Sequence, residues 1–423
     1  MYETLFFVND IIVGVVGVAF GLQLIYLLLF FLPAKKYKKA CRKHRFALFV
    51  CARNEEGVIG DTVKNLLAQD YPKQLFDVFV VAHNCTDRTA EIAREAGATV
   101  FEFNDDHPDR RRVAYALKHF MEKMLAEYDV YDSYIRFDAD NKPAANYVDL
   151  MNDAFDAGAK IAGGYKHSSN LTDNIYSKIS GLWYIRDSRF NCQVRSFFGL
   201  GQMPSGGGMM ISAEIIRKNR TFEQSGYCED ADFILAELLK GNRAAYVKEA
   251  VNYEEQPATF SDTFKRNMRM GRGLWFTFWR YGVLCLFKFL WSCVKLKPKY
   301  TYLDMFITEL FIPIALFLVL WIPAFYGFAL VYTGINRYPG QFYHLIYMIW
   351  IILIFAFIIP FIMQAFFVWM LERKRINAPF KKLLSGILLF PLFMVFYAAG
   401  IVLGILFRSK WKQIKRKEKP CGQ

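Results

Sequence analysis

The sequence predicts an α/β domain with a mainly parallel sheet, joined to an α-helical membrane region. Two short apolar runs, residues 46–50 and 78–82, are typical of buried parallel strands. The amphipathic stretches 60–69 and 89–96 follow them as helices, which gives the βαβ pattern of an α/β fold. A third observation is the apolar run 11–32, because about 20 apolar residues suffice to cross a bilayer as a helix.

The N-terminal apolar run is expected to be an uncleaved membrane anchor. The acidic residues Glu3 and Asp10 flank it on one side, and a basic cluster at 35–45 follows it. A signal peptide has the reverse order, with its basic end first and a small-residue cleavage site last. We therefore expect the N-terminus outside and the basic flank, with the domain after it, in the cytoplasm.

The charge distribution points to a membrane surface as the partner of the basic residues. The formal net charge is +14. The cations cluster near the predicted membrane edges, so anionic lipid headgroups are the expected partner and nucleic acid is not. The clusters are residues 35–45, 295–299, 373–382 and 408–419. The 8 cysteines lack C-x-x-C spacing, so neither disulfides nor a structural zinc site is expected.

The region after residue 262 is expected to be membrane-associated throughout. Residues 274–296 are apolar apart from Arg280, Lys288 and Lys295, whose spacing places them within one arc of a helix. A helix with a narrow cationic stripe and many aromatic residues is expected to lie in the membrane interface. Three further apolar runs are each long enough to span the bilayer. They are residues 305–333, 342–372 and 383–407.

The number of crossings stays open at this point. Three crossings from a cytoplasmic domain would leave the basic tail 408–419 outside, against the tendency of basic segments to stay inside. Either one run is irregular or re-entrant, for which the run around Pro391 is the candidate, or residues 274–296 span after all. The expected parts are an anchor with its basic flank (1–40), a cytoplasmic α/β domain (41–262), an interfacial segment (263–300), a transmembrane region (301–410) and a basic tail (411–423).

Two acidic motifs are the candidates for chemistry. Asp138 and Asp140 follow the strand-like residues 134–137, and Glu229 and Asp230 form a second acidic pair. In open α/β sheets ligands bind beyond the carboxyl ends of the strands, so the segments after residues 50, 82 and 137 should converge. Two carboxylates in a short loop can present oxygen ligands to one divalent cation. Taken alone, each motif also fits a solvated surface turn.

Six motifs in order give a resemblance to a known family. They are Ala52-Arg53-Asn54-Glu55-Glu56, His83-Asn84-Cys85-Thr86-Asp87, Asp138-Ala139-Asp140-Asn141, Pro204-Ser205-Gly206-Gly207-Gly208-Met209, Cys228-Glu229-Asp230 and Arg266-Asn267-Met268-Arg269-Met270. This series resembles the family 2 membrane glycosyltransferases, which include cellulose, hyaluronan and poly-N-acetylglucosamine synthases. The resemblance covers most of the chain and implies a GT-A-like, Rossmann-like nucleotide-sugar-binding domain.

The resemblance implies a role for each motif. Asp138 would contact the nucleoside, Asp140 would reach Mg²⁺ or Mn²⁺, and Asp230 would be the base that deprotonates the acceptor hydroxyl. Two alternatives stay open for Asp230, namely that it caps the following helix or that Glu229 is the base. The expected nucleotide-binding residues also include Asn54, Glu55, His83 and Arg269, and the expected acceptor-binding residues are Gly206, Gly207, Gly208, Glu229 and Trp275.

The sequence departs from the family pattern at three places. His83 stands where an aspartate near the nucleobase is usual, so uridine is inferred from the resemblance alone. Residues 110–112, three arginines, stand where a Gly-Lys pair is usual. The Gln-x-x-Arg-Trp motif of processive synthases keeps only Arg269, and Trp275 is the candidate for the lost aromatic residue.

The function expected from the resemblance is inverting, metal-dependent transfer of a sugar from a UDP-sugar to a growing polysaccharide. The chain would be a multi-pass protein of the cell membrane with a cytoplasmic catalytic domain. One alternative is transfer of a single sugar to a lipid carrier, which the altered motif around Arg269 favours. An alternative of another class is a non-catalytic scaffold or transporter. The sugar, the linkage, the acceptor and any accessory subunit cannot be inferred from the sequence.

Overall fold

The computed structural model divides the chain into two compact units. It describes residues 2–107, 110, 112–204, 206–222, 226–311, 314–315, 318, 324–331, 343, 346–347, 350, 354 and 357–407. The sheet unit comprises Leu32–Leu171 and Cys192–Gln256, and the helical unit comprises Met1–Phe31, Thr172–Asn191 and Pro257–Trp411. Residues 172–191 thus group with the helices, although they lie within the stretch 41–262 expected to be one domain.

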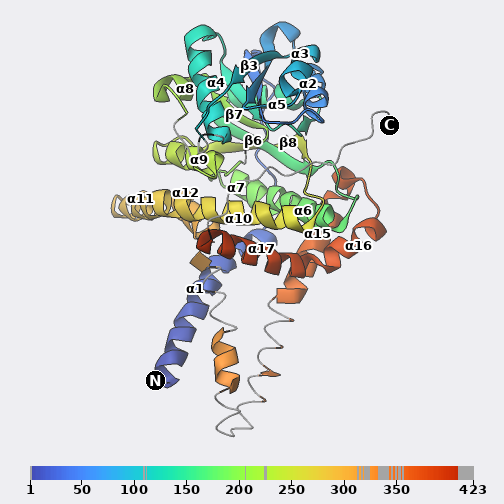
Figure 1. Ribbon diagram of the computed structural model, residues 1–423. Coiled ribbons are helices and arrows are strands. Elements are labelled where there is room, and N and C mark those ends of the chain that lie inside the picture. The colour runs from blue at the N-terminus through green and yellow to red at the C-terminus, as the bar shows by residue number, and fades with distance from the viewer. Residues whose placement is uncertain are drawn as a thin grey trace. The chain divides into compact units, whose positions relative to one another are not determined.

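The sheet unit is built on one mixed sheet. Among the described residues, eight strands follow in the order β3-β2-β1-β4-β7-β6-β8-β5. Figure 1 labels β3, β7, β6 and β8 of this sheet. The strands are β1 (Phe46–Ala52), β2 (Phe76–His83), β3 (Thr99–Phe103), β4 (Ser133–Phe137), β5 (Lys142–Pro143), β6 (Ile161–Ser168), β7 (Met209–Ser212) and β8 (Ala244–Glu254). Strands β1 to β4 pair in parallel, whereas β7 is antiparallel to both β4 and β6.

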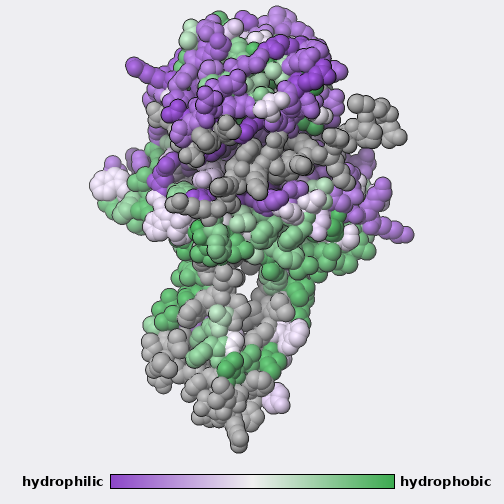
Figure 2. All heavy atoms as spheres, viewed as in Figure 1, coloured by the Kyte–Doolittle hydropathy of each residue, from purple (hydrophilic) through white to green (hydrophobic). Residues whose placement is uncertain are grey.

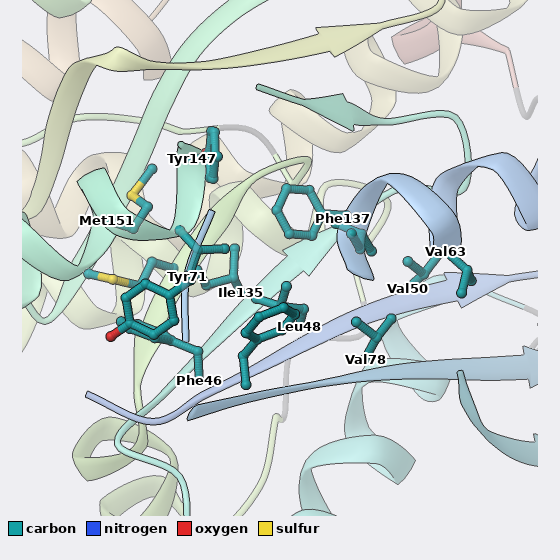
Figure 3. Packing of buried hydrophobic residues seen from close by; sticks show 14 of the residues in the cluster. Phe46, Leu48, Val50, Val63, Tyr71, Val78, Ile135, Phe137, Tyr147 and Met151 are labelled. Atoms are coloured by element: carbon teal, nitrogen blue, oxygen red, sulfur yellow. The ribbon is translucent and has the colours of Figure 1, made fainter. Parts of the chain in front are cut away.

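The strand β1 shows why this sequence forms a doubly covered sheet. All seven of its residues are buried. Phe46, Leu48 and Val50 join the core on one face, with side chains from α2 (Ile59–Leu67) and α5 (Tyr147–Asp156) (Figure 3). Ala47 and Phe49 join the core on the other face. A strand covered on both faces has to be apolar at every position, which is why the run 46–50 does not alternate with polar residues.

Helices cover both faces of this sheet. Helices α2 (Ile59–Leu67) and α3 (Thr89–Glu95) confirm the expected βαβ pattern, because β1 and β2 are parallel neighbours in register from Phe46↔Phe76. The remaining helices of the unit are a short 3₁₀ turn (Lys73–Leu75), α4 (Val113–Glu127), α5 (Tyr147–Asp156), α7 (Gln193–Phe197), α8 (Ala213–Asn219) and α9 (Glu229–Leu239).

The helical unit contains long apolar helices with short π-helical turns between them. Its elements are α1 (Tyr2–Leu28), α6 (Ile175–Arg186), a π turn (Asp187–Cys192), α10 (Phe260–Thr277), a π turn (Phe278–Gly282), α11 (Val283–Val294), α12 (Tyr300–Met305), a π turn (Phe306–Leu310), α15 (Ile359–Ile376), α16 (Phe380–Leu388) and α17 (Phe390–Leu406). Trp183 of α6, which is half-buried, packs on Tyr397 of α17 with ring centroids 5.0 Å apart.

Helices α10 and α17 approach each other closely at glycines. A Cβ on Gly404 would lie 2.0 Å from the carbonyl oxygen of Met268, and one on Gly271 would lie 2.3 Å from that of Ile401. Gly400 faces Cβ of Asn267 at 2.7 Å in the same way. Gly400 and Gly404 form a G-x-x-x-G pair in an apolar helix, a spacing that lets two helix backbones approach.

Surface hydropathy differs between the two units, with hydrophobic side chains gathered on the helical unit (Figure 2). On α10, the π turn that follows it and α11, the exposed large apolar residues include Phe276, Trp279, Phe287 and Trp291. The cations Arg280, Lys288 and Lys295 are exposed as well, and the ammonium group of Lys295 lies 5.2 Å from the ring centroid of Trp291. The surface of α11 is therefore both aromatic and cationic, as expected for residues 274–296.

A helix that crosses a bilayer has to be both long and apolar. Within the described ranges no single helix meets both, whereas α16 and α17, bent by 49° at their junction, meet them as a pair. The bend lies in the run 383–407, where Pro391 predicts an irregular segment. Residues 7–18 form a shorter apolar helix. Parts of the expected runs 305–333 and 342–372 lie outside the described residues. So do the basic tail 408–419 and the expected C-terminal part 411–423, both of them entirely.

Candidate active site

The first acidic motif occupies the loop that follows β4. Ala139 is buried in the core beneath this loop, and the hydroxyl of Thr62 donates a hydrogen bond of 2.6 Å to its carbonyl oxygen. Asp138 and Asp140 stand on either side of this anchored residue and remain partly exposed. The Asp138 side chain is 44 % exposed. The Asp-x-Asp spacing thus combines one residue that fixes the loop with two carboxylates that water or a ligand can reach.

Asn141 fixes the shape of the same loop. Its side chain is fully buried, and its Oδ1 accepts hydrogen bonds from the backbone N–H of Asp138 (3.1 Å) and from Nδ2 of Asn252 (2.9 Å). Its Nδ2 donates to Oδ1 of Asp140 at 3.3 Å. One amide therefore contacts both aspartates of the motif. Asn141 belongs to the quoted motif, but its role could not be predicted from the sequence, because its partner Asn252 is 111 residues away.

The three glycines at 206–208 are required by close contacts. A Cβ on Gly206 would lie 2.7 Å from Cζ of Arg136. One on Gly207 would lie 2.4 Å from Oδ1 of Asn141 and 2.8 Å from Oε1 of Glu254. Gly208 has φ +78 and passes over the hydroxyl of Tyr147, which donates to its carbonyl oxygen at 2.5 Å. These contacts explain why residues without a side chain stand at all three positions.

Asp230 contacts this glycine loop. The backbone N–H of Gly206 donates a hydrogen bond of 2.8 Å to its Oδ2. The N-cap of α9 is Cys228, and Asp230 lies in the first turn, where its Oδ1 accepts from the N–H of Ala231 at 2.8 Å. Asp230 is thus not the N-cap residue itself, but its carboxylate bonds the first turn of α9, and the alternative that it caps this helix stays open beside the role of base. The structure brings the expected base and the expected acceptor-binding glycines together within one unit.

Arg136, which the sequence analysis did not name as a site residue, joins the two acidic motifs. Its side chain is only 5 % exposed, and Nη2 lies 3.3 Å from Oδ1 of Asp138 and 3.0 Å from Oε1 of Glu229. Burial alone would lower the pKa of Arg136, but the charges of Asp138, Glu229 and Asp230 raise it above its ordinary value. The guanidinium is therefore a permanent cation among these carboxylates. An arginine inside the apolar run 134–137 is the one sequence signal that could have indicated it.

A second buried ion pair lies beside the loop. Nζ of Lys166 in β6 is 3.4 Å from Oε1 of Glu254 at the end of β8. Burial raises the pKa of Glu254, and the nearby charges of Asp138 and Asp140 raise it further, whereas Lys166 lowers it. The sequence analysis missed both residues, because nothing in their local sequence shows that β6 and β8 are neighbours.

The loops after β1 and β2 are tied to each other by hydrogen bonds. Nδ2 of Asn54 donates to the hydroxyl of Thr86 at 3.1 Å, and the N–H of Thr86 donates to Oδ1 of Asn54 at 2.8 Å. The N–H of Glu55 donates to the hydroxyl of Thr89 at 2.8 Å. Asn54 and Glu55 were expected to bind nucleotide. In the structure their described contacts fix the two loops relative to each other, and parallel β1, β2 and β4 bring all three predicted loops to one edge of the sheet.

His83 is the last residue of β2 and is only 3 % exposed. Its ring stacks on Phe103 with centroids 5.0 Å apart, and Phe103 stacks on His119 at 4.3 Å. Its Nε2 has no hydrogen-bond partner among the described residues. Burial, together with the charge of Arg53, lowers the pKa of His83 to about 4, so the imidazole is neutral at neutral pH.

This neutral imidazole predicts a loss of stability in acid. The unfolded chain takes up a proton at His83 near pH 6.5, whereas the folded protein resists it down to about pH 4. Stability linked to His83 is therefore complete above pH 6.5 and falls between these two values. We expect the midpoint of thermal unfolding, Tm, to fall less in His83→Gln than in the wild type between pH 7 and 4.5. His107→Gln, at an exposed histidine, is the control, and equal losses in wild type and His83→Gln would contradict the prediction.

Two expected site residues, Arg269 and Trp275, lie in the helical unit. Both are on α10, where Arg269 is exposed and Trp275 contacts Trp279 edge-on with centroids 5.6 Å apart. The cluster in the sheet unit therefore consists of Arg136, Asp138, Asp140, Glu229 and Asp230 with the glycine loop. The roles expected for Arg269 and Trp275 remain predictions.

Asp138 and Asp140 are the candidate oxygen ligands for a divalent cation at this loop. The described part of the chain contains no group of three or more His, Cys, Asp and Glu side chains arranged to hold a metal ion. Asp138 and Asp140 nevertheless offer hard carboxylate oxygens, the donor type that Mg²⁺ and Mn²⁺ prefer. Mg²⁺ in particular is commonly bound by one or two carboxylates together with substrate phosphates. The residues present therefore fit a cation held jointly with a diphosphate.

Comparisons with known proteins agree with this geometry. A probable glycosyltransferase, YdaM of Bacillus subtilis, is 25 % identical over 273 residues, which are 62 % of this chain and 61 % of that protein. The match thus spans about three fifths of that relative. The mannosyltransferase PcManGT of Pyrobaculum calidifontis, solved with GDP-Man and Mn²⁺, superposes with a TM-score of 0.56 at 16 % identity. This match covers 81 % of this chain and 96 % of that one, and it supports the GT-A-like fold. Residues 44–273, more than half of the chain, match the family described as glycosyltransferase like family 2, and the chain belongs to that family.

Proposed function

We propose that this chain is an inverting, metal-dependent glycosyltransferase that transfers a sugar from a nucleotide sugar, most simply a UDP-sugar, to a growing polysaccharide. The observation that carries the proposal is the link between the two acidic motifs. Arg136 contacts Asp138 and Glu229, and the N–H of Gly206 contacts Asp230. The groups needed for donor binding and for acceptor activation thus belong to one connected cluster.

On the donor side, Asp138 and Asp140 would bind the nucleotide diphosphate together with Mg²⁺ or Mn²⁺. The cation would neutralise the charge that accumulates on the leaving diphosphate. Asn141 holds the loop so that both carboxylates keep their positions, since it contacts the backbone of Asp138 and the side chain of Asp140. PcManGT was solved with GDP-Man and Mn²⁺, which supports a nucleotide sugar with a divalent cation as the donor. Whether the nucleobase of the donor is uracil or guanine is left to the experiment below.

On the acceptor side, Asp230 would take the proton of the acceptor hydroxyl as that oxygen attacks the sugar carbon from the face opposite the diphosphate. This displacement inverts the configuration at the carbon. Oδ2 of Asp230 accepts one hydrogen bond from Gly206, and a carboxylate oxygen can accept more than one. Glu229 is the competing base, but its carboxylate is paired with the buried guanidinium of Arg136 at 3.0 Å. A paired carboxylate is a weaker base, which favours Asp230.

We propose further that the chain is a multi-pass protein of the cell membrane with its catalytic domain in the cytoplasm. The exposed aromatic and cationic surface of α11 supports contact with lipid headgroups and acyl chains. The bent pair α16 and α17 supports a membrane segment. A membrane site would bring the enzyme close to a lipid-linked acceptor or to an emerging polymer.

The decisive experiment is sugar transfer by the purified full chain in lipid nanodiscs. Radiolabelled UDP-glucose, UDP-N-acetylglucosamine and GDP-mannose are supplied one at a time with Mn²⁺ or Mg²⁺, and any product is sized. Asp230→Asn in the same nanodiscs is the control for chemistry at this site. Long polymer from a UDP-sugar would support the proposal. A labelled lipid that carries one sugar would support the lipid-carrier alternative, and no turnover of any nucleotide sugar would support a non-catalytic role.

Two substitutions in α10, at Arg269 and at Trp275, test sugar transfer and product length separately. Arg269→Ala is expected to depress transfer to every acceptor, because a guanidinium can pair with two oxygens of the leaving diphosphate. Trp275→Ala is expected mainly to shorten the product, since an indole ring offers a stacking surface for sugars. Product size and total label incorporated are measured for both variants, with Trp291→Ala on α11 as the control. Unchanged product length in Trp275→Ala would refute its part of the prediction.

A further inference from the structure

The guanidinium of Arg136 lies in an unusual place for a charged group. It belongs to β4, whose five residues are all buried, and its own side chain is 5 % exposed. A buried charge loses the hydration that it has in water, and this loss is offset only if its partners are close and well oriented. The contacts of Arg136 therefore indicate what its burial achieves.

A single nitrogen of Arg136 contacts carboxylates from two different elements. Nη2 is 3.3 Å from Oδ1 of Asp138 in the loop after β4 and 3.0 Å from Oε1 of Glu229 in α9. Nε and Nη1 have no hydrogen-bond partner among the described residues. Nη2 thus bridges two elements, while the other two nitrogens donate to no described residue. An arginine placed for fold stability alone would be expected to pair both ends of its fork with one carboxylate.

The charges around this guanidinium would separate without it. The ionisable groups that face it are Asp138, Glu229 and Asp230, together with the thiol of Cys51 in β1. Three carboxylates at close range repel one another, and one central cation offsets this repulsion. The backbone of Gly206 lies against the same guanidinium, because a Cβ at that residue would be 2.7 Å from Cζ. Gly206 thus touches two members of the cluster, since its N–H also donates to Asp230.

We infer that Arg136 is a positioning residue that holds the donor-side carboxylate Asp138 and the acceptor-side pair Glu229 and Asp230 in one arrangement. The inference rests on the proposed function. In that reaction the acceptor oxygen must meet the sugar carbon in line with the departing diphosphate, so the donor loop and the base have to keep a fixed separation. A misplacement of about 1 Å in such an arrangement can cost about 10²-fold in rate.

The test uses Arg136→Lys in the full chain in nanodiscs. Lysine keeps the charge but offers a single ammonium in place of the planar fork. We expect kcat to fall by about 10²-fold with the KM for the donor changed much less. Arg45→Lys is the matched control, since Arg45 pairs with Asp77 at 3.2 Å just before β1, at the opposite ends of these strands.

A double-mutant cycle with Glu229→Gln separates positioning from bulk stability. If Arg136 acts through Glu229, the double variant should lose little more kcat than the more damaged single variant. Losses that multiply in the double variant, or a wild-type kcat in a folded Arg136→Lys protein, would overturn the inference.

One readout is independent of any transfer activity. Backbone hydrogen exchange at Gly206–Gly208 should accelerate in Arg136→Lys, whereas exchange in β1 and β2 should stay as in the wild type. Unchanged exchange at these glycines would overturn the inference even if the wild type transferred no sugar. A wild type without transfer would count against the proposed function instead. If Arg136→Lys fails to fold, Arg136→Gln takes its place in both measurements.

Discussion

Replacing Asp140 with alanine is expected to abolish sugar transfer and to weaken metal-dependent nucleotide binding, while the fold stays intact. The substitution removes one of the two carboxylates that the loop after β4 offers to a cation, and the diphosphate would then leave with its charge poorly neutralised. Loss of one such stabilising group typically costs about 10²–10³-fold in rate. The loop itself should persist, because Asn141 still accepts from the N–H of Asp138 and from Asn252.

Two measurements check this expectation. Transfer of radiolabel is compared in wild type and Asp140→Ala, and Mn²⁺-dependent binding of UDP and GDP is measured by calorimetry in the same nanodiscs. Asp129→Ala is the control, because Asp129 is a partly exposed carboxylate paired with Arg217 at 2.7 Å, away from the loop. Full activity in Asp140→Ala, or wild-type activity that a chelator does not reduce, would exclude the metal role.

Asp230→Asn is expected to lower turnover by about 10²–10⁴-fold, the range typical of a lost general base. An amide cannot take the acceptor proton, but its oxygen can still accept the hydrogen bond from the N–H of Gly206. Donor affinity should therefore change little. The measurement is kcat with a saturating donor, together with the Kd of the nucleotide in each variant.

Glu229→Gln is the matched comparison for Asp230→Asn, since the two carboxylates are adjacent in α9. Glu229→Gln should reduce turnover less, because its effect would come through the lost contact with Arg136 rather than through a lost base. A larger loss of turnover in Glu229→Gln than in Asp230→Asn would mean that Glu229, and not Asp230, is the base. A collapse of donor affinity in Asp230→Asn would move Asp230 to the nucleotide site.

The parts of the fold that the sequence predicts are those encoded by local patterns. The runs 46–50 and 78–82 are strands and parallel neighbours, because a strand buried on both faces has to be apolar at every residue. The loops that follow β1, β2 and β4 were predicted to meet, since parallel strands carry their carboxyl ends to one edge. The order of the motifs also indicated the family to which residues 44–273 belong.

The parts that the sequence could not predict depend on partners far along the chain. The sequence alone does not explain an arginine in an apolar strand, because the partner of Arg136, Glu229 at 3.0 Å, lies far along the chain. Asn141 needs Asn252, and Glu254 needs Lys166 from another strand. The stretch Thr172–Asn191 groups with the helical unit because of tertiary packing, such as the contact of Trp183 with Tyr397, which no local pattern encodes.

The glycine loop at 206–208 has a consequence for how such an enzyme could change during evolution. Each of its three residues faces a different polar side chain, namely Arg136, Asn141 with Glu254, and Tyr147. A single substitution to any larger residue would therefore collide with a group of the site, whatever acceptor the variant was selected to use. Adaptation to a new acceptor would have to proceed through residues around this loop, and a library randomised at these three positions should return glycine at all of them.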